Sequence, residues 1–287
     1  MRRQWTVMDP FTRACAVWML MMVLMAIVGP LLPLPDPREA DFDAPAVGFL
    51  SPGHPLGTDS NGYDLLSNVV NGASTSLLIA FVSVVVGGAL GATIGIVSAY
   101  RRGRLDNLVN LVFNVVLSIP NLVLGLALVA ILATSSDPSV VISSSRRIVV
   151  IMISLTFIVV PVLGRIARGA TLTWINREFV VAARSMGMRD RHIILRHIVP
   201  NVLPAIYSVG FLAVGVVIVA EGALSLLGVG VVDGVSWGAM IARVAGEFTY
   251  VPHSMYVPVL VLALTVISAN QLGDHLRSRL DVREGRL

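Results

Sequence analysis

Lysine is absent from this chain of 287 residues, and all 21 of its basic residues are arginine. A standard phosphate-binding loop of an ATPase needs a lysine that contacts the nucleotide phosphates, so this chain cannot form one. Catalysis through a lysine Schiff base is excluded for the same reason. If ATP drives the function of this protein, a different chain must hydrolyse it.

Cysteine, histidine and charge are scarce as well. The single cysteine, Cys15, excludes an intrachain disulfide and a cluster of thiolate metal ligands. The five histidines are scattered and no catalytic constellation is recognisable, so we expect neither a metal site nor catalytic residues. Charged residues make up only 13% of the chain, about half the share in soluble domains. Despite the net charge of +4, so apolar a chain is a poor candidate for binding nucleic acid.

Hydrophobic residues, by contrast, make up 55% of the chain, and the mean hydropathy is +0.82. They lie in long runs, and a bilayer core of about 30 Å needs roughly 20 apolar residues of helix. Valine and isoleucine favour strands in water, but in lipid the backbone must satisfy its own hydrogen bonds. We therefore expect an all-α integral membrane protein with six transmembrane helices. Their expected positions are residues 14–35, 65–100, 107–136, 148–164, 197–220 and 248–273.

The arginines predict the orientation of these spans. If the N-terminus lies in the cytoplasm, 17 arginines fall on the cytoplasmic side and four on the opposite side. Positive residues accumulate in the cytoplasmic loops of membrane proteins, so we expect both termini to be cytoplasmic. The four outside arginines are Arg38, Arg146, Arg147 and Arg243.

Two polar segments set the expected domain organisation. Residues 1–76 form an N-terminal segment with the first span and an acidic extracytoplasmic loop rich in proline and glycine. Residues 77–287 form the main transmembrane domain, which includes a long, basic cytoplasmic loop at residues 165–204. Loops of this length in a compact protein usually carry function.

The cytoplasmic loop is expected to hold two short helices that meet at a corner. Residues 177–187 predict a helix that ends at Gly187, because glycine readily takes the left-handed conformation of a helix C-terminus. Asp190 is placed to start the second helix, where a carboxylate complements the helix dipole. Pro200 marks the entry to the fifth span.

The surface of the first short helix is suited to contact with a partner. Ala182 and Ala183 let another molecule approach the backbone, and Phe179 and Met186 supply apolar anchors inside a rim of arginines. A helix with this pattern can equally lie on anionic lipid. The residues alone leave docking and lipid contact equally supported.

At this point a family resemblance becomes visible. Residues 177–204 resemble the loop of ABC importer permeases that has the pattern Glu-Ala-Ala, three residues, Gly, nine residues, Ile, any residue, Leu-Pro. Residues 54–67 and 224–238 resemble further segments of the C-type subunit of the dipeptide and oligopeptide branch, in matching order and spacing. Ala182, Ala183, Gly187 and Pro200 match the loop pattern, whereas Val181, His197 and Val199 replace its Glu, Ile and Leu.

The resemblance implies a type I ABC importer permease fold in which residues 165–204 couple the membrane domain to an ATPase. Val181 removes any polar contact made by the usual glutamate, and Glu178, one helical turn away, is a candidate substitute. The implied coupling residues are Glu178, Val181, Ala182, Ala183, Arg184, Gly187 and Pro200.

The implied partners are a second homologous permease subunit, separate ATPase subunits, an extracytoplasmic substrate-binding protein and membrane lipid. The ATPase subunits would bind the ATP and magnesium, so this chain would need no cofactor and would not be an enzyme. The implied location is the plasma membrane of a prokaryote, and the expected cargo is peptides. The alternatives are nickel chelates or haem as cargo, an ATP-independent secondary transporter, or a membrane scaffold without transport. A secondary transporter typically shows an inverted repeat or midplane carboxylates, and neither is evident in the sequence.

Three sets of residues in or beside the expected spans need an explanation. Gly87, Gly91 and Gly95 recur at steps of four, which predicts close helix packing. Glu221 has apolar neighbours and, together with Trp237, is a candidate for an outer gate or a receptor contact; a partner such as Arg243 or Arg147 would instead make it structural. A polar stripe in the third span either lines the translocation path or bonds neighbouring helices, and Pro120 should kink that span. The stripe recurs at steps of three or four residues, which places it on one face of a continuous helix, and consists of Asn107, Asn110, Asn114, Ser118 and Asn121.

Overall fold

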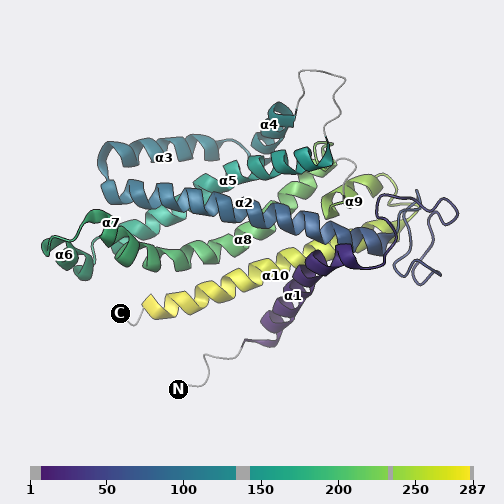
Figure 1. The fold of residues 1–287 in the computed structure, drawn as a ribbon, viewed down its shortest axis with the longest axis horizontal. Coiled ribbons are helices and arrows are strands. Elements are labelled where there is room, and N and C mark those ends of the chain that lie inside the picture. The colour runs from purple at the N-terminus through teal and green to yellow at the C-terminus, as the bar shows by residue number, and fades with distance from the viewer. Residues whose placement is uncertain (1–7, 134–142, 232–234, 285–287) are drawn as a thin grey trace.

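The computed structural model describes residues 8–133, 143–231 and 235–284, and this part of the chain contains helices and no strand. Figure 1 shows the helices arranged as an elongated bundle. A 3-10 turn, Gly29–Leu31, follows α1, and a π-helical turn, Ile194–Ile198, precedes α8. The helices are α1 Pro10–Val28, α2 Leu65–Arg101, α3 Gly103–Ser118, α4 Asn121–Ala133, α5 Ser144–Trp174, α6 Glu178–Ser185, α7 Asp190–Ile193, α8 Val199–Leu226, α9 Trp237–Val244 and α10 Pro252–Glu284.

Five of these segments are long and apolar enough to cross a bilayer, and α3 with α4 makes a sixth if the bent pair counts as one span. This agrees with the six expected spans. The third span differs in shape, because α3 and α4 meet at an angle of 92° where only a kink was expected. Pro120 lies in this break and has no N–H to continue the helix. Residues 76 and 77, the expected domain boundary, both lie inside α2.

The centre of the bundle is a close contact between α2 and α5, and glycine makes it possible. A Cβ on Gly87 would lie 2.8 Å from the Cβ of Val159, and one on Gly91 would lie 2.9 Å from the backbone nitrogen of Gly164. Any larger side chain would therefore push the two helices apart. The expected packing role of the glycine repeat is confirmed at this contact.

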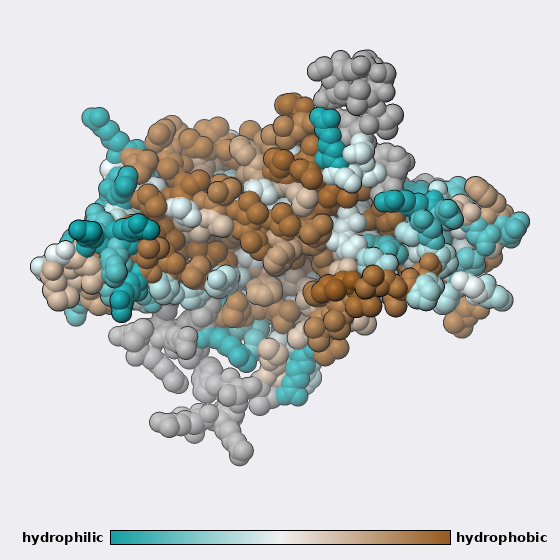
Figure 2. Space-filling model, in the orientation of Figure 1, coloured by the Kyte–Doolittle hydropathy of each residue, from teal (hydrophilic) through white to brown (hydrophobic). Residues whose placement is uncertain are grey.

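The polar parts of the molecule lie at its two ends. The elbow, residues 175–198 with α6 and α7, lies at one end, where α10 also finishes (Figure 1). The long loop, residues 32–64, and α9 lie at the other end. Between them the visible surface is mostly hydrophobic (Figure 2), as expected for a face in contact with lipid or with another membrane subunit. The two segments singled out for function thus lie at opposite ends of the bundle.

Candidate functional site

The elbow is a tight helical corner built on Gly187. The backbone of this glycine has a φ of +77°, the left-handed conformation expected for it. The N–H of Gly187 donates to the carbonyl of Arg184 at 3.0 Å, and the N–H of Met188 donates to the carbonyl of Ala183 at 3.1 Å. These bonds satisfy carbonyls that would otherwise be left open at the end of α6. The expected pair of short helices at a glycine corner is confirmed.

The helix α6 presents one apolar face to the chain and another to the outside. Val180 and Ala183 are buried against the bundle and anchor the helix. Phe179, Val181 and Met186 remain 41%, 53% and 76% exposed. These three residues are called the knob below. The knob lies at a polar end of the molecule, and an exposed apolar patch of this kind is typical of contact with a partner or with the membrane surface.

Several polar and aromatic contacts fasten the elbow to the bundle. The hydroxyl of Tyr100, at the end of α2, donates to Oδ1 of Asp190 at 2.7 Å. The guanidinium of Arg184 lies over the Tyr100 ring at 5.4 Å, so a single tyrosine contacts both sides of the glycine corner. The Phe179 ring lies 6.2 Å from that of Trp174. These contacts join the elbow to α2 and α5.

The remaining coupling candidates lie in or beside the same corner. Glu178 is the first residue of α6, and Ala182 is exposed beside the knob. Pro200 lies in the first turn of α8, directly after the π-helical turn. His197 lies in the π-helical turn, with its ring 6.0 Å from that of Phe179. The structure thus gathers the predicted coupling residues in one region, while their role stays a prediction.

The polar stripe does not form one helix face. Asn107, Asn110, Asn114 and Ser118 belong to α3, whereas Asn121 starts α4 beyond the 92° break. The single face predicted from the spacing is wrong for Asn121, because that prediction assumed a continuous helix. Asn114 accepts a hydrogen bond from Arg165 of α5 at 2.8 Å, which is the expected contact between helices.

The positions of the other members of the stripe do not decide between path lining and helix contact. Asn110 is half-buried, while Ser118 and Asn121 are exposed on the surface of this chain. Whether they line the translocation path or contact another subunit therefore stays a prediction.

At the opposite end, Glu221 and Trp237 hold α9 in place. Glu221 is 1% exposed, and its Oε1 accepts hydrogen bonds from Ser225 at 3.1 Å and from Ser236 at 2.8 Å. Trp237 is fully buried, its backbone N–H donates to Oγ of Ser76 and its indole N–H donates to the carbonyl of Val69, both at 3.0 Å. The side chains thus tie α9 to α8 and α2.

Arg243 is not the partner of Glu221 that the sequence suggested. Its Nε lies 3.1 Å from Oδ2 of Asp59 in the long loop. Its guanidinium also donates to Oδ1 of Asn68 at 2.9 Å and lies 4.1 Å from the centre of the Tyr63 ring. Burial raises the pKa of Asp59 above its usual value, and the nearby arginine works in the opposite direction. Arg243 therefore fastens the long loop to α9.

A second polar cluster closes the long loop on itself. The Nδ1 atom of His54 lies 2.8 Å from Oδ2 of Asp64, and its Nε2 lies 3.3 Å from Oδ2 of Asp41. The hydrogen bond with Asp64 is the main cause that raises the pKa of His54, and the bond with Asp41 adds to it. Asp64 also caps the start of α2, since it accepts from the N–H of Ser67. His54, Asp59 and Asp64 thus make structural contacts in the loop.

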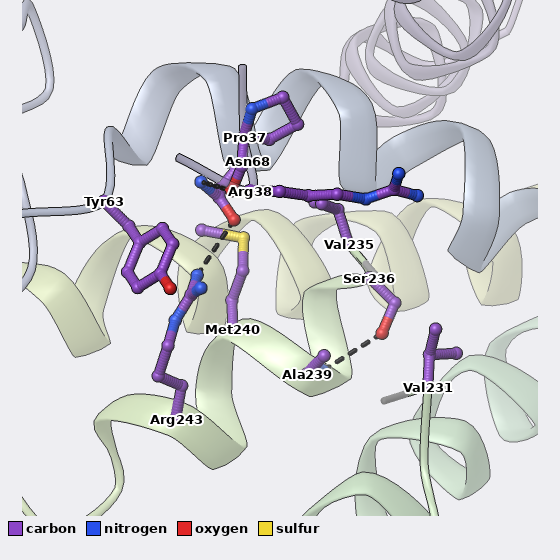
Figure 3. Close-up of a pocket in the computed structure, with 10 residues that line it drawn as sticks. All are labelled: Pro37, Arg38, Tyr63, Asn68, Val231, Val235, Ser236, Ala239, Met240 and Arg243. Carbon is purple, nitrogen blue, oxygen red and sulfur yellow. Dashed lines mark hydrogen bonds between the residues drawn. The ribbon is translucent and has the colours of Figure 1, made fainter. Parts of the chain in front are cut away.

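A cavity of about 340 Å³ opens between the long loop and α9 (Figure 3). Tyr63 and Arg38 come from the loop and Asn68 from α2, while Met240 and Arg243 rise from α9. Sequence reasoning did not find this cavity. Its arginines are far apart in the chain, and no local motif joins them.

The sequence of this chain also matches known proteins. Residues 91–282 match the model of a family described as "Binding-protein-dependent transport system inner membrane component". The chain belongs to this family. It is a multi-pass inner-membrane permease subunit of an ABC importer.

Individual relatives agree with this placement. The permease is 30% identical over 270 residues to the glutathione transport system permease protein GsiD of Pectobacterium atrosepticum, covering 93% of this chain and 85% of that one. It is also 30% identical over 262 residues to the dipeptide transport system permease protein DppC of Alkalihalophilus pseudofirmus, covering 90% and 81%. The inward-facing MetNI methionine ABC transporter contains a chain with the same fold: TM-score 0.58, 21% identity, covering 73% of this chain and 95% of that one.

One interhelical ion pair of the permease was not found from the sequence. Arg168 of α5 donates to both carboxylate oxygens of Asp106 in α3, at 2.7 and 2.8 Å. The two residues are 62 positions apart, and the only signal available is that opposite charges lie near the ends of two spans. This bidentate pair joins α3 to α5 near the elbow end.

Proposed function

We propose that this permease subunit moves peptides of the dipeptide, oligopeptide or glutathione type into the cell, driven by ATP that other subunits hydrolyse. The names of the relatives support this cargo class, because glutathione is itself a short peptide. The substrate-binding protein selects the cargo, so nickel chelates or haem would use the same machinery.

The observation that carries the coupling mechanism is the exposed knob at the glycine corner. Three apolar side chains on a rigid, well-fastened corner suit insertion into a groove of an ATPase subunit. Val181 is 53% exposed, so it would meet the groove with an apolar surface where relatives with the usual motif present a carboxylate. Glu178 begins the same helix and is placed to supply a nearby charge.

The proposed assembly contains this chain, a second homologous permease subunit, ATPase subunits and an extracytoplasmic binding protein, all in or at the lipid bilayer. ATP and magnesium belong to the ATPase subunits, and this chain contributes no catalytic residue and no cofactor. When the ATPases close, the elbow moves with them and tilts α2, α5 and α8. The long loop and α9, on the far side, receive cargo from the binding protein.

A knob variant tests the coupling assignment. Met186→Glu places a charge in the centre of the apolar contact and is expected to release the ATPase subunits from the purified complex. Ser278→Glu is the matched control, because Ser278 is exposed at the same end of the molecule but outside the elbow. Copurification in mild detergent and ATP-dependent uptake of a labelled dipeptide into proteoliposomes are the two measurements.

Three results would contradict the proposal. If Met186→Glu keeps its ATPases and its uptake, the knob does not dock. If the permease subunits still take up the peptide after the ATPase subunits are left out, the protein is a secondary transporter. If the wild-type complex hydrolyses ATP but moves no peptide, the cargo class is wrong.

A further inference from the structure

The cavity between the long loop and α9 has an unusual charge. Two arginines, Arg38 and Arg243, line it, and its described lining includes no carboxylate. Arg243 forms an ion pair with Asp59: its Nε lies 3.1 Å from Oδ2 of Asp59, which is not part of the cavity lining. Arg38 is exposed to solvent, and no carboxylate among the described lining residues pairs with its guanidinium.

The guanidinium of Arg38 has no partner among the described residues. It makes no hydrogen bond or ion pair with any residue that the structure describes. Asp36 accepts a bond from Arg38, but only from its backbone N–H, at 2.9 Å. Figure 3 shows the side chain extended along the cavity, on the opposite side from Arg243. Arg38 also borders a second cavity of about 440 Å³ beside the start of α2, and the lining of that cavity includes Asp36.

The rest of the lining suits a small amphipathic group. The hydroxyl of Tyr63 makes no hydrogen bond with the described residues and is free to donate. Val231, Val235 and Met240 supply an apolar wall. The volume of about 340 Å³ is large enough for a short chain end with one side chain.

We propose that this cavity is a carboxylate-binding site at the cargo-receiving end of the permease, with Arg38 as its principal ligand. A guanidinium presents paired N–H donors that match the two oxygens of a carboxylate. The carboxylate comes either from the end of the transported peptide or from an acidic side chain of the binding protein. The first source rests on the proposed function, whereas the site itself does not.

The direct test measures binding to the permease–ATPase complex in lipid nanodiscs without the binding protein. The probes are N-acetyl-alanyl-alanine and its C-terminal amide, followed by ligand-observed NMR. We expect the acid to bind and the amide not to bind. Arg38→Gln should lower the affinity for the acid by about tenfold or more. Arg146→Gln is the matched control, because Arg146 is exposed and lies outside the cavity. Arg38→Lys keeps the positive charge but loses the paired N–H donors, so it should bind the acid with an affinity between those of the wild type and Arg38→Gln.

A second measurement identifies the source of the carboxylate. The affinity of the ligand-free binding protein for the same nanodiscs is compared between wild type, Arg38→Gln and Arg146→Gln. If only Arg38→Gln weakens this docking, the site binds an acidic side chain of the binding protein. If the acid probe alone depends on Arg38, the site binds the peptide end. If neither measurement depends on Arg38, the inference is overturned.

These outcomes are separate from the fate of the proposed function. Failure of peptide uptake by the wild-type complex would refute the cargo class while leaving acid-specific, Arg38-dependent binding readable in the nanodiscs. Conversely, normal uptake with no dependence on Arg38 in either measurement would refute the site alone.

Discussion

Gly187 controls the geometry of the elbow through its backbone, not through lack of space. No atom lies within 4 Å of where its Cβ would be, but its φ of +77° is strained for any residue with a side chain. Gly187→Ala should cost about 1–2 kcal/mol at the corner and change the angle between α6 and α7. We expect ATP hydrolysis to continue with fewer peptides moved per ATP.

Asparagine supplies the control at this position. It tolerates the left-handed conformation better than alanine, so Gly187→Asn should recover most of the coupling. The measurement is uptake per ATP hydrolysed in proteoliposomes. Equal coupling in the alanine variant and the wild type would show that the corner angle is unimportant.

At Gly238, the space available for a side chain limits substitution, and not the backbone conformation. A Cβ there would lie 2.7 Å from the Cα of Gly222 and 2.8 Å from Oε2 of Glu221. Gly238→Ala must therefore displace α9 from α8 and is expected to destabilise the protein by about 1–3 kcal/mol. Gly246→Ala, with no atom within 4 Å of its Cβ, is the matched control. Thermal unfolding in detergent should separate the two variants, and identical curves would contradict the contact.

At the scale of elements, the elbow depends on how α2 ends. Tyr100→Phe removes the hydroxyl that donates to Asp190 but keeps the ring beneath Arg184. Loss of this bond should loosen the elbow by about 1–2 kcal/mol and speed hydrogen exchange across residues 178–193. Tyr207→Phe is the control, because Tyr207 is 57% exposed on α8. Unchanged exchange in Tyr100→Phe would show that α2 does not hold the elbow.

The long loop is expected to respond to pH through His54. Its carboxylate partners raise its pKa in the folded loop above the unfolded value of about 6.5. The stabilisation is therefore complete below pH of about 6.5 and is lost as pH rises through the higher folded pKa. We expect proteolysis of the loop to accelerate over that range in the wild type.

His54→Gln serves as the reference for this pH effect, since it has no titrating ring. Comparing the two proteins at each pH cancels the pH dependence of the protease itself. If the ratio of their cleavage rates stays constant as the pH rises, His54 does not control the loop.

The elements themselves were largely predictable from the sequence. Runs of apolar residues located the spans, and the repeat from Gly87 to Gly95 predicted a close helix contact, because a helix-face pattern is local. That the partner is α5 became visible only in the structure. Pro120 predicted a kink but not its 92° angle, which depends on what surrounds the break. Pairs such as Asp106 with Arg168 join distant positions, and no local pattern in one sequence reveals which charges meet.

At the scale of the whole molecule, polarity and charge separate into two ends joined by an apolar body (Figure 2). The proposed mechanism requires the elbow to be cytoplasmic and the long loop to lie outside, as the arginine distribution predicts. The single native cysteine, Cys15, is 5% exposed, so it should contribute little background to cysteine labelling. Phe42 and Met186, 86% and 76% exposed, are suitable reporters for the two ends.

Labelling with a membrane-impermeant maleimide then tests the orientation. Phe42→Cys should react in intact spheroplasts and Met186→Cys only in inside-out vesicles, because the bilayer blocks the reagent from the opposite side. The unmodified protein controls for Cys15. Reaction of Met186→Cys in intact spheroplasts would place the elbow outside, where no ATPase can reach it, and the coupling mechanism would fail with it. Since the loop and the elbow lie at opposite ends of one bundle, both variants must report the same orientation.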